Sequence, residues 1–317
     1  MSKPDLITIG DSSIDLYMKI ADNAGVSEST TGGQPKFCFY HGTKIPVESF
    51  ETSVAGNAIN VAVGAKLLGI NTSVYSELGD DSNTDRILNE LKQLDIETNY
   101  CNKNKNTPTD LHTIVVFQGE RTIFSYHGKR DYKVPNWKAP KYIYYTSMPE
   151  GFESFQKELI DYLEKNSEVG LAFNPGTIQM KTGVDSLRNI LLVTDILFVN
   201  KEEAMRLTDT NGDLDSLLKE LAKLGPKLIV ITDGENGANA YDGQNITHQR
   251  SYNDNRPLVD MTGAGDSFSA AFMSAIIYGK SLETALKWGV INSGNNIKEI
   301  GSFKGLLNKD QIEKINI

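Results

Sequence analysis

One nine-residue stretch combines side chains and backbone that could move a phosphoryl group. It runs Asp260-Met261-Thr262-Gly263-Ala264-Gly265-Asp266-Ser267-Phe268 and leads straight into a helical pattern. Small residues before a helix let an anion approach the backbone, and the unpaired first-turn amides attract it. A carboxylate beside an anion is useful if it accepts a proton. We therefore predict a phosphate cradle at Gly263, Ala264 and Gly265 with Asp266 as general base. The structural alternative is an acid that favours the dipole of its helix.

Bulk composition argues against several classes of partner. The chain has 317 residues and a formal net charge of −9, unlike a general nucleic-acid or anionic-membrane binder. No apolar run is long enough to span a bilayer, and the N-terminus enters a strand-like run without a signal-peptide pattern. Cys38 and Cys101 lack metal-ligand spacing, and the four scattered histidines are expected to be structural or solvated. We therefore expect a cytoplasmic protein with no nucleic-acid or membrane partner.

The elements that must position this stretch alternate along the chain. Short apolar runs predict buried strands at residues 6–10, 72–76, 142–145, 171–173, 196–199 and 228–231. Helical apolar spacing lies between several of them, at residues 58–68, 87–94 and 217–224. Strands that alternate with helices indicate βαβ units. We therefore expect an α/β fold, a doubly wound and mostly parallel sheet with helices on both faces.

Two segments break this alternation. Residues 16–53 contain no clear helix, and residues 100–132 carry the pattern of a β-hairpin. We expect the two to pair into one small β-sheet that acts as a lid and excludes water from a transfer site. The main domain is then residues 1–15, 54–99 and 133–317. Surface hairpins without a role are the alternative.

Four further motifs gather small and polar residues at predicted strand ends or helix starts. They are Gly10-Asp11-Ser12-Ser13-Ile14-Asp15, Ala55-Gly56-Asn57-Ala58-Ile59-Asn60, Asn200-Lys201-Glu202-Glu203 and Ile231-Thr232-Asp233-Gly234-Glu235-Asn236-Gly237. On their residues alone, Asn57 and Asn200 could simply cap helices, and the last motif is an ordinary turn. Each motif by itself therefore leaves a structural and a functional interpretation open.

Taken together, these motifs resemble those of the ribokinase/PfkB family of carbohydrate kinases. The nine-residue stretch is similar to the family's C-terminal signature and departs from it at Met261, where threonine is usual. The other four motifs stand in the family's order, so the resemblance covers the whole chain. It implies a ribokinase-like fold with a small β lid and an ATP-dependent phosphotransferase that uses an alcohol group as acceptor.

The resemblance also implies roles for particular residues. Asp15 would accept hydrogen bonds from sugar hydroxyls, Gly56 would let the backbone approach the substrate, and Asn57 and Asn60 would bond its hydroxyls. The nucleotide would lie along Asn200, Thr232, Gly234 and Gly237. A Mg²⁺ ion would be held by Glu203, mostly through water. A monovalent cation, usually K⁺, would lie at Asp260, Thr262 and Gly301. Contact of Asn292, Asn295 or Asn296 with the adenine stays open.

Three functions remain open at this point. The first is transfer of the γ-phosphoryl group of ATP to a hydroxymethyl oxygen of a ribose- or fructose-like sugar. The second is a nucleoside kinase acting on the ribose 5′-OH, and the third is a non-catalytic sugar- or nucleotide-binding protein. Residues 174–179 lack the arginine of the Asp-x-Asn-x-Arg pattern that many related sugar kinases carry, which disfavours an acidic sugar or a sugar phosphate. The lid is expected to join two copies into a homodimer.

Overall fold

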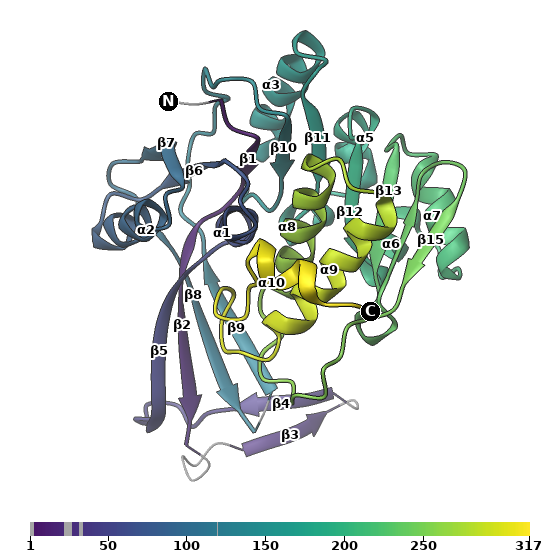
Figure 1. Ribbon diagram of the computed structural model, residues 1–317. Helices are drawn as coiled ribbons and strands as arrows, with labels where there is room; N and C mark the ends of the chain where they lie inside the picture. Colours follow the sequence, from purple (N-terminus) through teal and green to yellow (C-terminus); the bar gives the residue numbers. More distant parts are fainter. Residues whose placement is uncertain (1–2, 22–26, 32–33, 119) are drawn as a thin grey trace.

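The computed structural model describes residues 3–21, 27–31, 34–118 and 120–317, and within them the main layer is a nine-stranded sheet (Figure 1). Its order is β15-β14-β13-β12-β11-β10-β1-β6-β7, and only the β13–β14 and β14–β15 pairs are antiparallel. The strands are β1 (Leu6–Ile9), β6 (Thr72–Leu78), β7 (Glu97–Lys103), β10 (Tyr142–Tyr145), β11 (Gly170–Phe173), β12 (Ile196–Asn200), β13 (Leu228–Thr232), β14 (Ala238–Tyr241) and β15 (Ile246–Gln249). The expected mostly parallel sheet is confirmed.

Helices cover both faces of this sheet. One face packs against α1 (Asn57–Leu67), α8 (Ala264–Ile277) and α9 (Leu282–Asn296) in a single apolar cluster. The other face packs against α3 (Phe152–Lys165), α5 (Val184–Leu192), α6 (Lys201–Thr208) and α7 (Leu214–Ala222). The described residues also form α2 (Ser82–Gln93), α4 (Thr177–Lys181), α10 (Lys309–Lys314) and the 3₁₀ turn η1 (Gly234–Asn236). Burial on both faces explains why the parallel strands are continuous apolar runs.

Helix α8 lies in close contact with α1, and its sequence makes this possible. Its residues from Asp266 to Ala275 are all buried, and many of them are alanine or serine. A Cβ atom built on Gly64 of α1 would lie only 2.6 Å from the Cβ of Ala270. Because small residues face each other here, the two helices approach closely enough to bring polar groups at their N-termini together.

The two predicted insertions pair into a second sheet, as expected. Its order is β5-β2-β8-β9, and β2 pairs in parallel with β8 and antiparallel with β5. The strands are β2 (Ser13–Ile20), β5 (Val47–Ala55), β8 (Asp110–Phe117) and β9 (Glu120–Tyr126). These strands project away from the main sheet (Figure 1). A separate ribbon is formed by β3 (Ser27–Thr31) and β4 (Gln34–Cys38). Residues 100–103, which the sequence placed in the lid, belong to β7 of the main sheet.

The strand order reverses beside β1. From β1 the chain builds the sheet outward through β6 and β7, then returns to the other side of β1 with β10. A crevice outside the carboxyl ends of β1 and β10 is where ligands bind in open sheets of this kind. Within the described residues, no helix is long and apolar enough to cross a membrane.

Candidate active site

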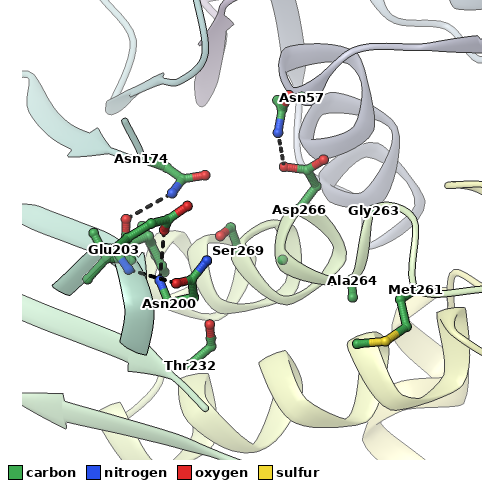
Figure 2. A pocket seen from close by; sticks show the side chains of 13 residues that line it. Asn57, Asn174, Asn200, Glu203, Thr232, Met261, Gly263, Ala264, Asp266 and Ser269 are labelled. Atoms are coloured by element: carbon green, nitrogen blue, oxygen red, sulfur yellow. Dashed lines mark hydrogen bonds between the residues drawn. The ribbon is translucent and has the colours of Figure 1, made fainter. Parts of the chain in front are cut away.

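A pocket of about 230 Å³ opens at the carboxyl edge of the main sheet, beside the start of α8. It is lined by Asn57, Asn174, Phe198, Val199, Asn200, Glu203, Thr232, Met261, Gly263, Ala264, Gly265, Asp266 and Ser269. Figure 2 shows Asn200, Glu203 and Thr232 on one side and Asp266 with Ala264 and Met261 on the other. Most of the pocket therefore comes from four of the predicted motifs, which lie far apart in the sequence.

Asp266 is buried, and both of its carboxylate oxygens accept hydrogen bonds from α1. The side-chain amide of Asn57 donates to Oδ1 at 3.0 Å, and that of Asn60 donates to Oδ2 at 2.7 Å (Figure 2 shows the first bond). Burial raises the pKa of Asp266 to about 6, and the bonds from Asn60 and Asn57 partly offset this rise. The structure thus assigns these two amides to Asp266, whereas the sequence analysis assigned them to substrate hydroxyls.

The loop of residues 260–265, called here the anion loop, leads into α8 through Gly263. Gly263 has a left-handed φ of 70°, and a Cβ atom there would lie 2.9 Å from the Cβ of Ser302. A Cβ atom on Gly265 would meet no atom within 4 Å, so open space lies above this residue. The amide of Ala264 is engaged, because it donates to the carbonyl of Met261 at 3.2 Å. First-turn amides such as those of Gly265 and Asp266 have no acceptor within their own helix and suit an anion.

Asn200 and Glu203 face the pocket from the start of α6, and they also cap that helix. The Asn200 side chain accepts from the Glu203 amide at 2.9 Å, and Glu203 Oε2 accepts from the Asn200 amide at 2.8 Å. Burial raises the pKa of the Glu203 carboxyl. This reciprocal capping box agrees with the interpretation that the motif only caps a helix. Because both residues also line the pocket, a role in ligand binding stays open as well. One carboxylate oxygen of Glu203 is used in the cap.

Of the residues expected along the nucleotide, Thr232 lines the pocket and two glycines do not. Thr232 is the last residue of β13, and Gly234 begins the 3₁₀ turn that follows. Gly237 has a left-handed φ of 92°, and a Cβ atom there would lie 2.1 Å from the carbonyl oxygen of Gln249. The glycine at 237 is therefore required by the packing of β14 on β15.

A second group of polar residues, called here the acid–imidazole cluster, lies where the lid strands leave the main sheet. It comprises Asp11, Asp15, Asp110, His112, His127 and Arg130. Nδ1 of His112 lies 3.2 Å from Oδ1 of Asp15, and Ser13 donates to the same oxygen at 3.3 Å. The pairing register of β2 with β8 places Asp15 opposite His112. Burial lowers the pKa of His112, but the hydrogen bond and charge of Asp15 outweigh it, so the pKa is raised.

Asp110 is buried and forms the ion pairs at the centre of the cluster. Asp110 accepts from Arg130 at 2.5 Å and from the Gly128 amide at 3.0 Å, and Nδ1 of His127 lies 2.9 Å from its other oxygen. The rings of His112 and His127 meet edge to face at 5.4 Å. The sequence analysis expected the histidines to be structural or solvated, and His112 lies against the carboxylate of Asp15, the predicted substrate-binding residue.

Asp11 links the cluster to the main sheet and to Asp266. Its amide donates to the carbonyl of Ser147, which follows β10, so it lies at the reversal of strand order. Burial raises the pKa of Asp11 to about 6, and the charge of Asp266 acts in the same direction. Gly56 has a φ of 117°, and a Cβ atom there would lie 2.5 Å from the carbonyl oxygen of Asp11. The close approach at Gly56 is therefore to the protein's own backbone.

The three residues expected at a monovalent cation come together at the beginning of the anion loop. Oδ1 of Asp260 accepts from the amide of Thr262 at 2.9 Å, and Oδ2 accepts from the amide of Gly301 at 3.0 Å. Nearby, both polar ends of the Asn292 side chain bond backbone groups, and Asn296 donates to the Thr262 carbonyl at 3.3 Å. The asparagines at 292 and 296 therefore tie α9 to the anion loop.

A doubly wound sheet that carries a buried carboxylate at an anion loop, with a second sheet beside it, defines a class of phosphotransferase with an alcohol group as acceptor. The model of the pfkB family carbohydrate kinases matches residues 25–302 of the chain. The chain therefore belongs to the PfkB family of carbohydrate kinases and is an ATP-dependent enzyme of that family.

Curated relatives of different specificity resemble the chain to similar degrees. The ATP-dependent 6-phosphofructokinase of Thermoanaerobacterium thermosaccharolyticum is 24% identical over 295 residues, which cover 87% of this chain and 88% of the relative. The ribokinase of Bacillus subtilis is 26% identical and covers 84% and 89%. The nucleoside kinase of Methanocaldococcus jannaschii is 28% identical and covers 79% and 80%. These values leave the acceptor unresolved.

Solved structures support the fold along nearly the whole chain. The ribokinase of Arabidopsis thaliana, complexed with ribose and ATP, superposes with a TM-score of 0.84 at 21% identity, covering 99% of this chain and 98% of that one. The nucleoside kinase of Methanocaldococcus jannaschii superposes with a TM-score of 0.81 at 22% identity and the same coverage. The fold is therefore that of ribokinase-like proteins.

Proposed function

We propose that this chain transfers the γ-phosphoryl group of ATP to a hydroxymethyl oxygen of a ribose- or fructose-like sugar. The observation that carries the proposal is the position of Asp266. Its carboxylate is fixed by Asn57 and Asn60 beside the first turn of α8, and it lines the pocket. A fixed carboxylate with a pKa of about 6 is mostly ionised at neutral pH and can still accept a proton.

The transfer of the phosphoryl group is accompanied by the transfer of one proton. The acceptor O–H gives its proton to Asp266, and the acceptor oxygen forms a bond to the γ-phosphorus. The bond from that phosphorus to the bridging oxygen breaks, and ADP leaves with the electron pair. The amides of Gly265 and Asp266 face the charge on the transferred oxygens. Gly263 holds the turn that aims these amides.

Magnesium fits the donor set as an ion held mainly by phosphates and water. No cluster of three or more His, Cys, Asp or Glu that could hold a metal occurs among the described residues. Mg²⁺ commonly uses one or two carboxylates together with substrate phosphates. We infer that Glu203 is that carboxylate, because it lines the pocket while its other oxygen serves in the cap. When bound, the ion neutralises charge on the phosphates.

A sugar is favoured over a nucleoside by the chemistry around Asp15. The side chains nearest to it are those of Ser13 and His112, and Asp11 lies in the same cluster. These groups offer hydrogen bonds to several hydroxyls and little apolar surface for a base. The alternative remains a nucleoside kinase, supported by the likeness to the Methanocaldococcus jannaschii enzyme.

An acceptor screen tests the proposal. The purified protein is incubated with ATP and Mg²⁺ and with ribose, fructose, adenosine, cytidine or inosine at equal concentration, and ADP release is followed. We expect one of the sugars to stimulate ADP release, with mass spectrometry locating the phosphate on its hydroxymethyl oxygen. Faster turnover of a nucleoside would favour the alternative. If none of these five compounds stimulates ADP release, the proposed acceptor class is wrong.

We also infer that the lid, residues 16–53 with the part of 100–132 beyond β7, pairs two copies of the chain. Its outer strands carry apolar side chains into solvent: Phe50 is 73% exposed, and Ile123 and Phe124 are 52% and 55% exposed. Val115 and Phe117 of β8 are buried within the chain with Ile20, so the contact is expected through the outer strands β5 and β9.

Light scattering gives the mass that decides this pairing. We expect a dimer at micromolar concentration, because exposed apolar edge strands are otherwise a liability. The double change Phe50→Lys and Ile123→Lys should yield a monomer of unchanged circular dichroism. A monomeric wild type would contradict the pairing.

A further inference from the structure

The predicted monovalent cation site is already occupied by a side chain of the lid. Arg121 lies at the start of β9, and its Nη1 atom donates to Oδ1 of Asp260 at 3.0 Å and to Oγ1 of Thr262 at 2.8 Å. These residues are 139 and 141 positions apart in the sequence. The lid strand therefore delivers a fixed positive charge to the beginning of the anion loop.

Three further hydrogen bonds reach the Asp260 carboxylate besides the one from Arg121. Besides Arg121, Oδ1 of Asp260 accepts from the amide of Thr262 at 2.9 Å and from its hydroxyl at 2.7 Å. Oδ2 accepts from the amide of Gly301, so Gly301 presents its N–H to the carboxylate. Three of these four donors, Arg121 included, share Oδ1, and Oδ2 has the Gly301 amide alone. A monovalent cation would have to share Oδ1 with the guanidinium of Arg121, so with Arg121 in place these side chains do not fit the ion.

We propose that Arg121 takes the place of a monovalent cation, so that the lid and not a bound ion orders the anion loop. The inference rests on the proposed kinase function, because its effect on the rate acts through that loop. Arg121 is a positioning residue, since it contacts Asp260 and Thr262, which precede Gly263. The loop is complete only while β9 lies against it. The anion loop and the lid are thus joined through Arg121.

The ion pair between Arg121 and Asp260 is expected to fix the position of the loop and to contribute little to the stability of the fold. The side chain of Arg121 is 42% exposed and that of Asp260 is 11% exposed. An ion pair at such a surface adds little to the free energy of unfolding. Its removal should therefore affect the rate and the response to ions while leaving the fold intact. A comparable pair joins Lys304 to Glu51 of β5 at 2.8 Å without touching the anion loop, and it supplies a matched control.

The experiment compares wild type, Arg121→Ala, Arg121→Lys and Lys304→Ala in sodium, potassium and tetramethylammonium chloride at fixed ionic strength. Initial rates are measured with the acceptor found in the screen, and melting temperatures are measured without substrates. We expect the same wild-type rate and melting temperature in all three salts. Arg121→Ala should be slower by about tenfold or more in tetramethylammonium, because the loop loses its charge, and potassium should restore part of the rate.

The other variants and the melting curves separate the possible causes. Arg121→Lys keeps a charge without the planar fork, so it should lie between wild type and Arg121→Ala. Lys304→Ala should behave as wild type. Potassium should raise the melting temperature of Arg121→Ala alone, since a ligand that binds the folded state stabilises it. The melting curves test the inference even if no acceptor is found.

Two results would overturn the substitution of an ion by Arg121. The first is a wild-type rate or melting temperature that rises specifically in potassium. The second is an Arg121→Ala variant whose rate and melting temperature are the same in all three salts, which would leave Arg121 as a lid contact only.

Discussion

The anion loop and the acid–imidazole cluster form the two ends of the site, and they are built in different ways. The loop depends on backbone geometry: a left-handed Gly263, open space above Gly265 and the start of one helix. The cluster depends on side chains, with Asp15 and His112 brought together from positions 97 residues apart. The loop can bind any phosphate donor through amides. The cluster has titratable groups that can select among acceptors, so specificity is expected to reside there.

Asp266 lies between the two ends of the site, and its replacement should have the largest effect on the rate. Asp266→Asn cannot accept the proton, so kcat should fall by about 10²–10⁴-fold while the affinity for ATP stays nearly unchanged. Asn60 can flip its amide to bond the new side chain, because its own Oδ1 atom has no partner. Steady-state kinetics and calorimetry with ATP measure the two quantities.

The control for this change is Asp215→Asn, an exposed acid in the first turn of α7. This variant tests whether the loss of any acid in the first turn of a helix lowers the rate, and we expect the rate to be unchanged. For wild type, the rate should fall as the pH drops below about 6, because Asp266 becomes protonated there. A variant within tenfold of wild type would remove Asp266 as the base.

A change confined to the cluster should sharpen the contrast with the loop. Asp15→Ala removes the acceptor that faces Ser13 and His112 and leaves sugar hydroxyls unpaired. We expect the KM for the sugar to rise by about 10- to 100-fold, with ATP affinity unaffected. Asp15→Asn keeps the size of the side chain and should lose less. Calorimetry with sugar and nucleotide separately would contradict this role if both affinities fell equally.

A change confined to the loop should have the smallest effect on the rate. Gly265→Ala places a methyl group in the open space where an anion would lie, and turnover should fall by about tenfold. Its fold should be retained or slightly strengthened, because alanine suits a helix better than glycine. Gly263→Ala should instead lower the melting temperature, since it strains a left-handed residue against Ser302. If the two variants had the same melting temperature and the same rate, the difference proposed between Gly263 and Gly265 would be wrong.

Local signals made much of the loop predictable from the sequence. The Gly-Ala-Gly stretch with the acid at 266 is one short motif, and Asn200 with Glu203 is another. Within each motif the interacting residues are only a few positions apart, so the geometry follows from turn and capping rules. The alternation of apolar strands and helices likewise predicted the doubly wound sheet. The two glycines at 234 and 237 were predicted along the nucleotide, and the structure places them outside the pocket, with Gly237 serving the strand pairing.

The remaining contacts of the site depend on distances that no local pattern encodes. Asn57 and Asn60 face Asp266 because small residues let α1 and α8 approach closely. His112 faces Asp15 because of the register between β2 and β8, and Arg121 reaches Asp260 because β9 lies at the edge of the lid. The alternation of Asp110 and His112 on one strand was the available signal, and it gains meaning only once the partner strand is known.

The buried acids described above also make the stability of the fold depend on pH. Burial raises the pKa of Asp11 and Asp266 from 3.8 to about 6, so between these values the folded chain binds protons that the unfolded chain has released. Each carboxyl therefore lowers the free energy of unfolding as the pH rises through this window, by on the order of 2–3 kcal/mol. His112 acts in the same direction: its folded pKa is raised above 6.5, so the stability it contributes below that pH is lost at higher pH. The ionised site needed for proton transfer is thus maintained at the expense of resistance to unfolding.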